Sequence, residues 1–394
     1  MEILKSKNLS IILFDEPGSQ RLLPLTRTRP VADLRIGILT CKQRWEKISG
    51  KKVYVLASKD LQPIQETIPE GEYLFIDAAL IPTKELLNDI LNLSISHALK
   101  DEIGLIAGRG NYNPVVGTNT IISLFKQFNL YKQVKRFDSL LRIIQMNDEL
   151  LRCDFELINA AKLAKTDASV TLINPSQIYI EEGAKISHSV LNATDGPIYI
   201  SGNTTIMEGC LIRGPFAMGE GSVLKMGTKV YGATTIGPFC TVGGEIKNSI
   251  FFGYSNKAHD GYVGDSIIGE WCNLGAGTSC SNVKNTGGEV QLWSEYDQTF
   301  ISVGNKFGMV MGDYSRTSIN TSINTGTVIG ICCNVFCDGL TAKFISNFSW
   351  GLKGEKYHIE KVLKDVNNWK VFKQKRLLDN EEKLLREIYS NLFL

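Results

Sequence analysis

A six-residue period of apolar side chains dominates the middle of the chain. Between residues 200 and 242 every sixth position is aliphatic or methionine, and a small residue precedes most of these positions by two. This period fits neither an α-helix nor a single strand. It is typical of hexapeptide repeats, in which each hexad forms a short strand and a tight turn and three hexads close one triangular coil. The apolar positions are Ile200, Ile206, Ile212, Met218, Leu224, Val230, Ile236 and Val242.

The period predicts a left-handed parallel β-helix over residues 170–350, because stacked coils bury a column of side chains that a single coil cannot bury. After Val242 the phase slips by two residues, and a second six-spaced set runs through Asn256 and Tyr262 to Cys280. We interpret Asn256 as a polar break in the apolar column. Residues 281–306 have no period, which indicates a functional excursion or an oligomer contact.

The first 160 residues follow a different pattern, in which short apolar runs alternate with segments of helical period. This alternation predicts a compact α/β, Rossmann-type domain over residues 1–160. The tail, residues 355–394, has a helical period and is expected to cap the open end of the β-helix or to pack on a neighbouring chain. The predicted front-domain elements are strands at 9–14, 52–57 and 72–76, helices at 38–48, 83–91 and 119–128, and a linking helix at 147–161 that Asn147 caps, with His97 placed in a further helical segment.

Composition narrows the classes of partner and compartment. The net charge of +2 implies no polyanion partner, so we expect no nucleic-acid binding. There is no apolar run of about 18 residues and no signal-peptide pattern, which indicates no membrane partner and a cytoplasmic protein. Four of the nine cysteines fall on small-residue positions of hexads and are expected to be free thiols in a reducing compartment. These are Cys210, Cys240, Cys272 and Cys333.

A loop after the first predicted strand carries the motif GSQRLLPLT from Gly18, followed by Thr-Arg-Pro. Such a loop at the carboxyl edge of a parallel sheet can bind phosphate, although a plain surface loop has the same composition. The motif resembles the Gly-rich signature of sugar-1-phosphate nucleotidylyltransferases. The resemblance implies that Gly18 and Arg21 hold a nucleoside triphosphate whose phosphates Mg²⁺ screens. Val31 stands where that family has lysine.

Two further acidic positions and one arginine complete the candidate nucleotide site. Arg29 and Asp33 could compensate for the missing lysine. Asp77 could be the family's metal-binding aspartate, although a strand end facing solvent is the more common reason for such a residue. The front motif and the segment from residue 253 to 285 are together typical of GlmU-like proteins. These join a divergent nucleotidyltransferase-like domain to a β-helix, and the resemblance covers nearly the whole chain.

Residues 257–265, followed by the Asn-Leu-Gly-Ala-Gly-Thr run from Asn273, resemble the acetyltransferase half of the bifunctional N-acetylglucosamine-1-phosphate uridylyltransferase. The resemblance implies that His259 is the general base and that Tyr262 and Asn273 contact the substrate. Ala258 replaces an asparagine of that pattern, and Ser-Asn-Val replaces its Cys-Asn-Tyr at residues 281–283, so the acceptor sugar stays open. The resemblance also implies a homo-trimer with coenzyme A in the groove between subunits.

The predicted chemistry is acyl transfer from acetyl-CoA to an amine. Imidazole is suited to take the amine proton at neutral pH, and backbone N–H groups of a glycine-rich turn can stabilise the oxyanion. Solvated surface charge is the competing interpretation for each lysine. The remaining candidates are Gly275, Ala276, Gly277 and Lys306 for coenzyme A, and Asn256, Lys257 and Lys284 for the substrate.

Three functional hypotheses follow. The first is a bifunctional enzyme of nucleotide-sugar synthesis, which acetylates an amino-sugar phosphate such as glucosamine-1-phosphate and transfers a nucleotide from UTP or dTTP to a sugar-1-phosphate, toward products such as UDP-N-acetylglucosamine. The second is an acyltransferase whose front domain only binds a nucleotide sugar. The third is a non-catalytic trimeric scaffold or sensor. The polar cluster at residues 257–260 argues against the third.

Overall fold

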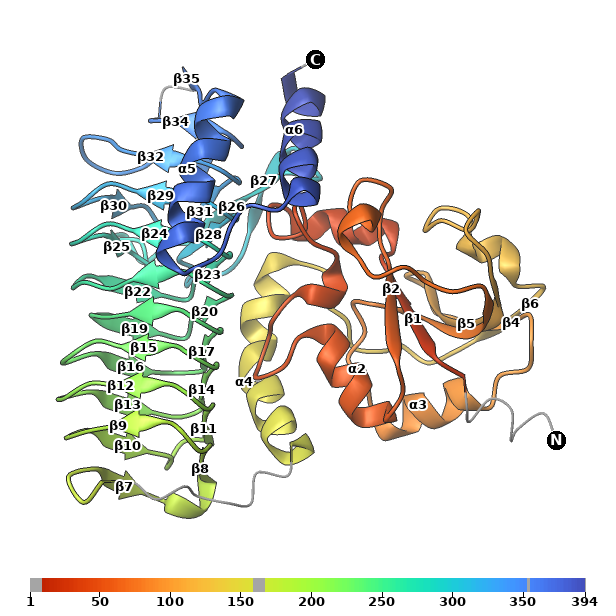
Figure 1. The fold of residues 1–394 in the computed structure, drawn as a ribbon, viewed down its shortest axis with the longest axis horizontal. Helices are drawn as coiled ribbons and strands as arrows, with labels where there is room; N and C mark the ends of the chain where they lie inside the picture. Colours follow the sequence, from red (N-terminus) through yellow and green to blue (C-terminus); the bar gives the residue numbers. More distant parts are fainter. Residues whose placement is uncertain (1–8, 159–166, 353–354, 394) are drawn as a thin grey trace.

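The computed structural model describes residues 9–158, 167–352 and 355–393, and its three parts are seen side by side in Figure 1. The front domain is built on a mixed six-stranded sheet in the order β2-β1-β3-β5-β4-β6. In chain order the strands are β1 (Ile11–Phe14), β2 (Val53–Leu56), β3 (Gly71–Asp77), β4 (His97–Lys100), β5 (Leu105–Tyr112) and β6 (Gln127–Leu130). The helices are α2 (Cys41–Ser49), α3 (Lys84–Leu91) and α4 (Leu140–Leu157), with short 3-10 turns η1 (Pro17–Leu22), η2 (Val31–Asp33), η3 (Gln62–Ile64) and η4 (Ile121–Leu124).

Strands β1, β2 and β3 are mutually parallel. Their carboxyl ends therefore meet at one edge of the sheet. The signature loop follows β1 at this edge. The three predicted strands and the first two predicted helices are confirmed. The helix predicted at 119–128 is wrong, because Gln127 pairs with His97 and the segment joins the sheet as edge strand β6. The same pairing places His97 in a strand and not in a helix.

Helix α4 links the two large domains, and it begins earlier than the sequence predicts. Its N-cap is Ser139, whose Oγ accepts a hydrogen bond from the backbone N–H of Arg142. Asn147 is not a cap but a buried residue in the middle of the helix, 1% exposed. Its amide donates to the Ala233 carbonyl of the β-helix over 2.8 Å, so its polar side chain joins the domains. The end of the predicted helix lies partly outside the described residues.

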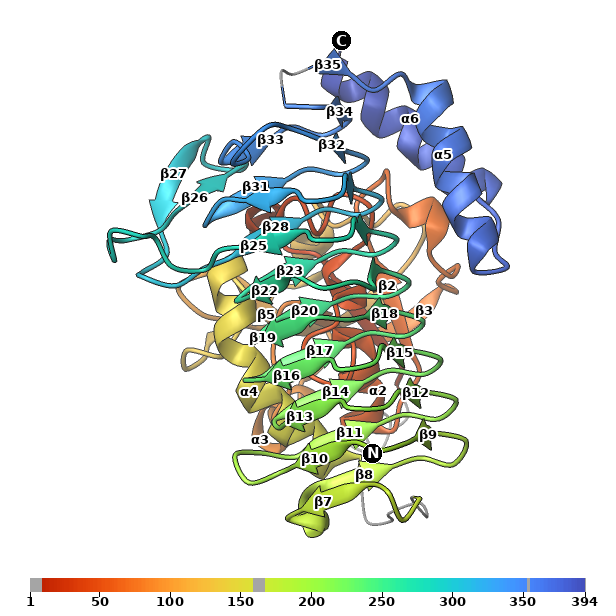
Figure 2. The same cartoon turned by 90° about the vertical axis from the view of Figure 1, so that its left-hand side faces the viewer.

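The middle of the chain is a parallel β-helix, as the hexad period predicts, and Figure 2 shows its strands stacked as successive rungs. Each coil contributes one strand to each of three faces. Face 1 holds β7 (Thr171–Ile173), which the 3-10 turn η5 (Pro175–Gln177) follows, then β10 (Val190–Asn192), β13 (Leu211–Arg213), β16 (Lys229–Tyr231), β19 (Glu245–Lys247), β22 (Tyr262–Gly264), β25 (Ser279–Cys280) and β30 (Ser322–Ile323). Face 2 holds β8 (Ile178–Ile180), β11 (Ile198–Ile200), β14 (Phe216–Met218), β17 (Thr234–Ile236), β20 (Ile250–Phe251), β23 (Ile267–Ile268), β28 (Met309–Met311), β31 (Thr327–Ile329) and β33 (Phe344–Ile345).

Face 3 completes the triangular cross-section of the β-helix. A hairpin interrupts the coils between faces 1 and 2. The hairpin consists of the antiparallel strands β26 (Gln291–Ser294) and β27 (Thr299–Ser302), within the stretch that lacks a period. Face 3 holds β9 (Lys185–Ile186), β12 (Thr205–Ile206), β15 (Val223–Leu224), β18 (Thr241–Val242), β21 (Asn256–Lys257), β24 (Asn273–Leu274), β29 (Arg316–Thr317), β32 (Asn334–Val335), β34 (Ser349–Trp350) and β35 (Glu355–Lys356).

The interior column shows where the predicted phase needs correction. Leu224 pairs with Val242, and Val242 pairs with Lys257, so one coil is three residues shorter than its predecessor. The inward position of that coil is therefore Lys257, which is 1% exposed, while Asn256 points outward. The polar break in the apolar column is a lysine and not the asparagine that the six-spaced set indicated.

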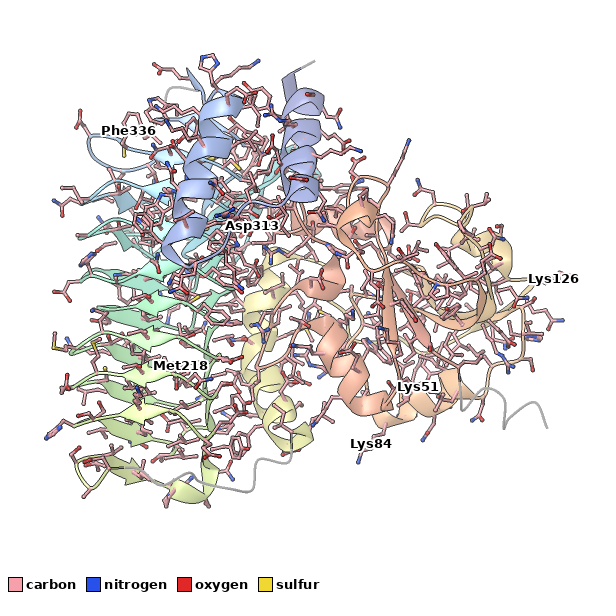
Figure 3. All side chains as sticks on the ribbon, in the orientation of Figure 1. Lys51, Lys84, Lys126, Met218, Asp313 and Phe336 are labelled. Carbon is pink, nitrogen blue, oxygen red and sulfur yellow. The ribbon has the colours of Figure 1, made fainter. Side chains whose placement is uncertain are left out.

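The front domain packs on face 2 through helix α4 and a network of buried charges. Asp154 of α4 is fully buried and accepts from Arg44 Nε over 2.7 Å. It also accepts the backbone N–H of Ile38 over 2.9 Å. Asp313 of the β-helix, labelled in Figure 3, accepts from Thr28 and Arg29 of the front domain. The Asp154 pair lies within the front domain and holds the Ile38 loop to α4, whereas Asp313 pairs across the contact with the β-helix. Both pairs require well-formed geometry because their charges are buried.

Two C-terminal helices, α5 (Ile359–Phe372) and α6 (Asp379–Phe393), lie along the side of the upper coils. A stacked aromatic column of Phe239, Tyr254 and Trp271 runs along the corner between faces 2 and 3, with ring centroids 5.1 and 4.2 Å apart. The ammonium of Lys370 in α5 lies 4.8 Å from the Trp271 centroid and pairs with Glu381 of α6. None of the helices among the described residues is long and apolar enough to cross a membrane.

Candidate functional sites

A cleft of about 640 Å³ opens at the carboxyl edge of the front-domain sheet. Asp15 follows β1 directly, and the loop at residues 58–61 follows β2, so both come from strand ends as parallel-sheet geometry predicts. The walls come from three distant parts of the chain: the signature loop, the tip of the β26–β27 hairpin and the end of α6. The main lining residues are Asp15, Glu16, Ser19, Gln20, Thr26, Arg27, Ser58, Lys59, Glu295, Tyr296, Gln298, Asn391 and Leu392.

Asp15 fixes the base of this cleft. It is 9% exposed, and its Oδ1 accepts the backbone N–H of Val31 over 3.1 Å. Burial raises the pKa of Asp15 to about 7, against the lowering effect of that hydrogen bond. Val31, the residue that stands where the family has lysine, is thus held by its backbone to the strand end.

The structure divides the four predicted nucleotide-binding residues between two places. Gly18 and Arg21 lie exposed on η1, whose Ser19 borders the cleft. Arg29 and Asp33 instead border a separate cavity of about 410 Å³ between the front domain, the β-helix and the tail.

The Arg29 guanidinium is committed to the domain contact. It pairs with Glu270 over 2.8 Å and with Asp313, and the side chain is 10% exposed. These two carboxylates, set against desolvation, raise the pKa of Arg29. Asp33 accepts from Gln65 Nε2 over 3.2 Å, and burial raises its pKa. Neither side chain reaches the cleft that η1 borders.

The groups near Asp77 do not fit a protein-held magnesium ion. Asp77 is 2% exposed, its Oδ1 accepts the Ala79 N–H over 2.9 Å, and its Oδ2 lies 3.6 Å from Arg136 Nε. Burial raises the pKa of Asp77 to about 7. Within the described residues no group of three or more His, Cys, Asp or Glu side chains could hold a metal ion. The prediction that Asp77 faces solvent is therefore wrong, because the side chain is buried beside Arg136, and it belongs to no metal-ligating group among the described residues.

The second candidate site is the turn between faces 3 and 1 that carries His259. His259 and Asp260 are exposed at this corner, between β21 and β22. The turn at residues 275–278 lies on the next coil, and Gly277 N–H donates to the Asp260 carbonyl over 3.1 Å. The structure thus brings His259 next to the predicted glycine-rich turn, because the two segments occupy the same corner of adjacent coils.

Lys257 lies inside the β-helix beneath this turn. Its Nζ donates to the carbonyl of His259 over 2.7 Å and to the carbonyl of Gly243 over 3.3 Å. Burial lowers the pKa of Lys257 to about 8. An inward ammonium in this position cannot touch a ligand at the surface. It fixes the backbone that carries His259.

The hydrogen bonds of the glycine-rich turn leave one N–H for a ligand. Gly275 N–H donates to Thr317 Oγ1 over 3.1 Å, and Gly277 N–H is used as described above. Ala276 N–H has no hydrogen bond within the described part of the chain. Its carbonyl accepts from Asn320 N–H over 2.6 Å, which orients the peptide. Of the three predicted oxyanion donors, Ala276 is therefore the one that can still act.

The other predicted ligand-binding residues are spread over face 3, face 1 and the excursion between faces 1 and 2. Asn256 and Asn273 pair across face 3, with their side chains half-buried. Tyr262 starts β22 on face 1, and its N–H donates to Ser279 Oγ over 3.2 Å. Lys284 and Lys306 belong to the excursion between faces 1 and 2, at the opposite end of face 1 from His259. Within a single chain, these two lysines therefore do not lie at the His259 turn.

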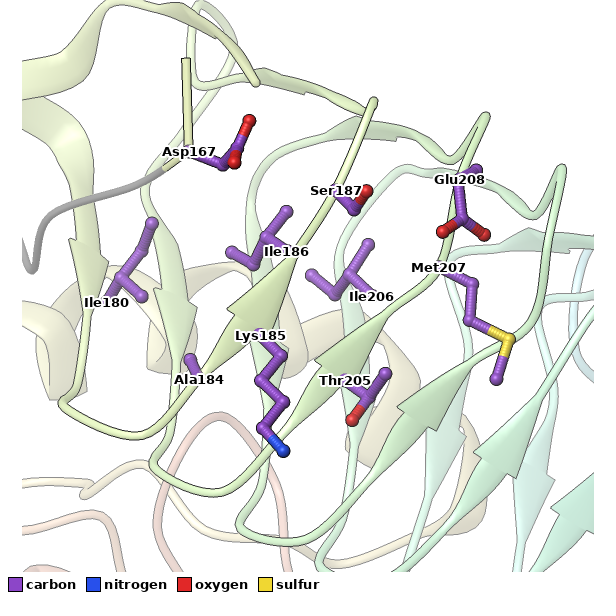
Figure 4. Close-up of a pocket in the computed structure, with 10 residues that line it drawn as sticks. All are labelled: Asp167, Ile180, Ala184, Lys185, Ile186, Ser187, Thr205, Ile206, Met207 and Glu208. Atoms are coloured by element: carbon purple, nitrogen blue, oxygen red, sulfur yellow. The ribbon is translucent and has the colours of Figure 1, made fainter. Parts of the chain in front are cut away.

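Sequence reasoning missed the hairpin residues Glu295 and Tyr296. The missing period of residues 281–306 marked the segment as unusual, but its position over the front cleft depends on how the domains pack. A further cavity of about 380 Å³, shown in Figure 4, lies at the first coils of the β-helix. Core side chains Ile180, Ile186 and Ile206 line much of this cavity. The cavity therefore lies where the apolar column of the β-helix begins.

Comparison with known proteins agrees with this two-part architecture. Residues 11–162 match the family described as "Sugar nucleotidyl transferase". The "Bifunctional protein GlmU" of Synechococcus elongatus is 28% identical over 214 residues, which cover 48% of this chain and 43% of that protein. The protein of the same name from Heliobacterium modesticaldum is 27% identical over 271 residues, covering 59% of this chain and 52% of that protein. The "Bifunctional sugar-1-phosphate nucleotidylyltransferase/acetyltransferase" of Sulfurisphaera tokodaii is 31% identical over 157 residues, covering 40% and 37%.

The chain thus spans about half or less of the length of these relatives. The front domain matches the sugar nucleotidyl transferase family and is joined to a parallel β-helix. In this arrangement the chain resembles GlmU-like fusion proteins, as the sequence indicates.

Proposed function

We propose that the chain is a bifunctional transferase of sugar-phosphate metabolism. The β-helix acetylates an amino-sugar phosphate such as glucosamine-1-phosphate at the His259 turn, and the front cleft transfers a nucleotide from UTP or dTTP to a sugar-1-phosphate. The observation that carries the proposal is that His259 and the free N–H of Ala276 share one corner of adjacent coils. A base and an oxyanion donor are the two groups that N-acyl transfer requires.

The acyl transfer runs as follows. The amine nitrogen attacks the thioester carbonyl carbon of acetyl-CoA and forms the C–N bond, while His259 takes the proton that the nitrogen loses. Ala276 N–H stabilises the oxyanion. The C–S bond then breaks, and the leaving thiolate receives the proton from His259. Lys257 is a positioning residue, because it holds the carbonyl of His259 from inside the β-helix.

Asn256, Tyr262 and Asn273 are proposed substrate contacts, on the strands that flank the His259 turn. Lys284 and Lys306 lie at the other corner of face 1, so their proposed contacts to sugar phosphate or coenzyme A require a neighbouring copy. This placement supports the homo-trimer that the resemblance implies.

In the front cleft, an oxygen of the sugar-1-phosphate attacks the α-phosphorus of the nucleoside triphosphate, a P–O bond forms, and pyrophosphate leaves. Gly18 and Arg21 are the proposed phosphate contacts. Mg²⁺ would arrive with the triphosphate, since the described side chains form no cage for it.

A second candidate function for the front domain is nucleotide-sugar binding without turnover. The commitment of Arg29 to Glu270 and Asp313, and of Asp77 to Arg136, favours it. The β-helix chemistry is the same under both candidates.

The experiment is a pair of assays on the full chain. Thiol release from acetyl-CoA is measured with glucosamine-1-phosphate, and pyrophosphate release is measured with UTP or dTTP and a sugar-1-phosphate. Thiol release that depends on the amino sugar supports acyl transfer, and no release with any amino-sugar phosphate would sink it. Pyrophosphate release separates the bifunctional enzyme from the second candidate.

A further inference from the structure

The tip of the β26–β27 hairpin forms a wall of the front cleft, although it belongs to the β-helix. Glu295, Tyr296 and Gln298 all line the cleft together with the signature loop. Glu295 pairs with Arg27, 268 residues earlier in the chain, and the guanidinium of Arg21 lies 5.4 Å from the centroid of the Tyr296 ring. The long excursion from the coils therefore ends at the loop that carries the nucleotidyl transferase signature.

Glu295 presents an unused acceptor at this wall. Its side chain is 11% exposed, and its Oε1 accepts from Arg27 and, over 3.3 Å, from Asn347 Nδ2. Its Oε2 is buried and has no hydrogen-bond partner among the described residues. A buried carboxylate oxygen without a donor is costly, by about 1–3 kcal/mol or more. A ligand N–H or O–H that reaches Oε2, which is itself covered from solvent, would remove that cost.

The neighbouring side chains complete a surface for a flat polar ring. Tyr296 is 45% exposed and offers an aromatic face. The Gln298 Nε2 donates to the Glu295 carbonyl over 2.6 Å, so the amide oxygen remains as a second acceptor. An aromatic face beside acceptors suits a ring with an apolar face and donors at its edge.

The fold of the hairpin does not depend on these residues. The ring of Trp293 packs 5.1 Å from Phe300 and 5.4 Å from Phe344, and Leu292 is fully buried. Apolar packing therefore holds the body of the hairpin, while Glu295 at its tip ties the hairpin to Arg27 and Asn347.

We propose that the β26–β27 hairpin is a specificity element of the front cleft, in which Glu295 and Tyr296 bind the neutral ring of the ligand. That ring is either the hexose of the sugar phosphate, which has an apolar C–H face and hydroxyl donors, or the base of the nucleotide, which has a flat face and N–H donors at its edge. The inference rests on the proposed function of the cleft. It adds that a hairpin of the β-helix contacts the ligand bound by the front domain and selects between ligands.

Three ligands test this inference by calorimetric titration of the full chain: UTP, N-acetylglucosamine-1-phosphate and inorganic pyrophosphate. The variants are Glu295→Gln, which replaces one carboxylate oxygen with a donor, and Tyr296→Ala. Glu289→Gln is the matched control, because Glu289 lies at the base of the same hairpin, is exposed and bonds Ser302. Thermal unfolding of each variant checks the fold.

We expect Glu295→Gln to raise the Kd of either UTP or the sugar phosphate about tenfold or more, the loss of a hydrogen bond to a charged group. Pyrophosphate affinity and the control should not change. Weakening of UTP identifies the base as the bound ring, and weakening of the sugar phosphate identifies the hexose. Equal weakening of all three ligands, or no change in any, overturns the inference and leaves the proposed function intact. If the wild-type chain binds none of the three, the proposed function of the cleft fails as well.

Discussion

The two candidate sites are built in opposite ways. The front cleft is enclosed by three parts of one chain, the signature loop, the hairpin of the β-helix and the end of α6. The His259 turn stands exposed on a corner of the β-helix, and its hydrogen-bonded neighbours are turns of adjacent coils. The difference suggests that one site is completed by domain packing within the chain. The other carries the proposed base and oxyanion donor, and under the proposed trimer its further walls would come from a neighbouring copy.

The largest effect is expected at the exposed corner. His259→Asn removes the proposed base and should lower the rate of thiol release by roughly 10²–10⁴-fold, the usual contribution of general base catalysis. Pyrophosphate release should be unchanged, because the front cleft does not contain His259.

His188→Asn is the matched control for that variant. His188 occupies the same corner between faces 3 and 1 on an earlier coil and is also exposed. Thiol release at the wild-type rate by His259→Asn, or an equal loss in His188→Asn, would contradict the assignment of the base.

The enclosed site depends on buried charges between the domains. Asp313 is 2% exposed and accepts from Thr28, Arg29 and the Glu270 N–H. Asp313→Asn leaves the Arg29 charge poorly paired, and we expect a loss of about 3–5 kcal/mol in the free energy of unfolding. Denaturant unfolding measures this loss.

The control for the interface is an ion pair on the surface. Glu85 and Lys132 are 68% and 60% exposed, so Glu85→Gln should cost less than about 1 kcal/mol. Similar losses for Asp313→Asn and Glu85→Gln would show that the domain contact is not held by buried charge.

A smaller, pH-dependent effect is expected from Lys257. Its pKa is lowered by burial from the ordinary value of 10.5 to about 8, so the unfolded chain binds more protons than the folded chain between these values. Stability from this group therefore rises as pH increases from about 8 to 10.5.

Lys257→Met removes that dependence while filling similar space. The free energy of unfolding of wild type relative to Lys257→Met should increase across this pH range, as measured by urea unfolding at each pH. A difference that stays constant with pH would show that Lys257 is not held as a buried titrating group.

The smallest effect is expected at the hairpin base. Lys306 is exposed and lies at the other end of face 1 from His259. Lys306→Ala should raise the KM for acetyl-CoA only about two- to fivefold, the range of one exposed charge contact, with kcat unchanged. A fall in kcat would instead place Lys306 in the acyl-transfer chemistry itself.

The sequence predicted the regular parts of the two regions better than their irregular parts. The hexad period is a local signal that repeats, so the coils from Ile200 to Val242 were predictable, and the strands of the front domain were marked by apolar runs. The sequence showed a slip of phase after Val242 but not that one coil is three residues shorter, and this shortening turned Lys257 inward where Asn256 was expected.

Tertiary contacts account for the remaining differences between the predicted and the observed structure. Gln127 became a strand residue because β4 was there to pair with it. The predicted nucleotide residues were neighbours in sequence, yet Arg29 turned to Asp313 while Arg21 turned to Tyr296. Glu295 carries no motif, and its relevance depends on contact with Arg27, which no local pattern encodes.

The contrast between an enclosed and a shared site can be tested directly by dilution. Thiol release and pyrophosphate release are measured per chain on the same samples, at concentrations spanning the dissociation of the proposed trimer, with the mass of the particle followed by light scattering. We predict that thiol release per chain falls as the oligomer dissociates, whereas pyrophosphate release per chain stays constant. Constant thiol release from chains shown to be monomeric would contradict the account, as would a parallel loss of both activities.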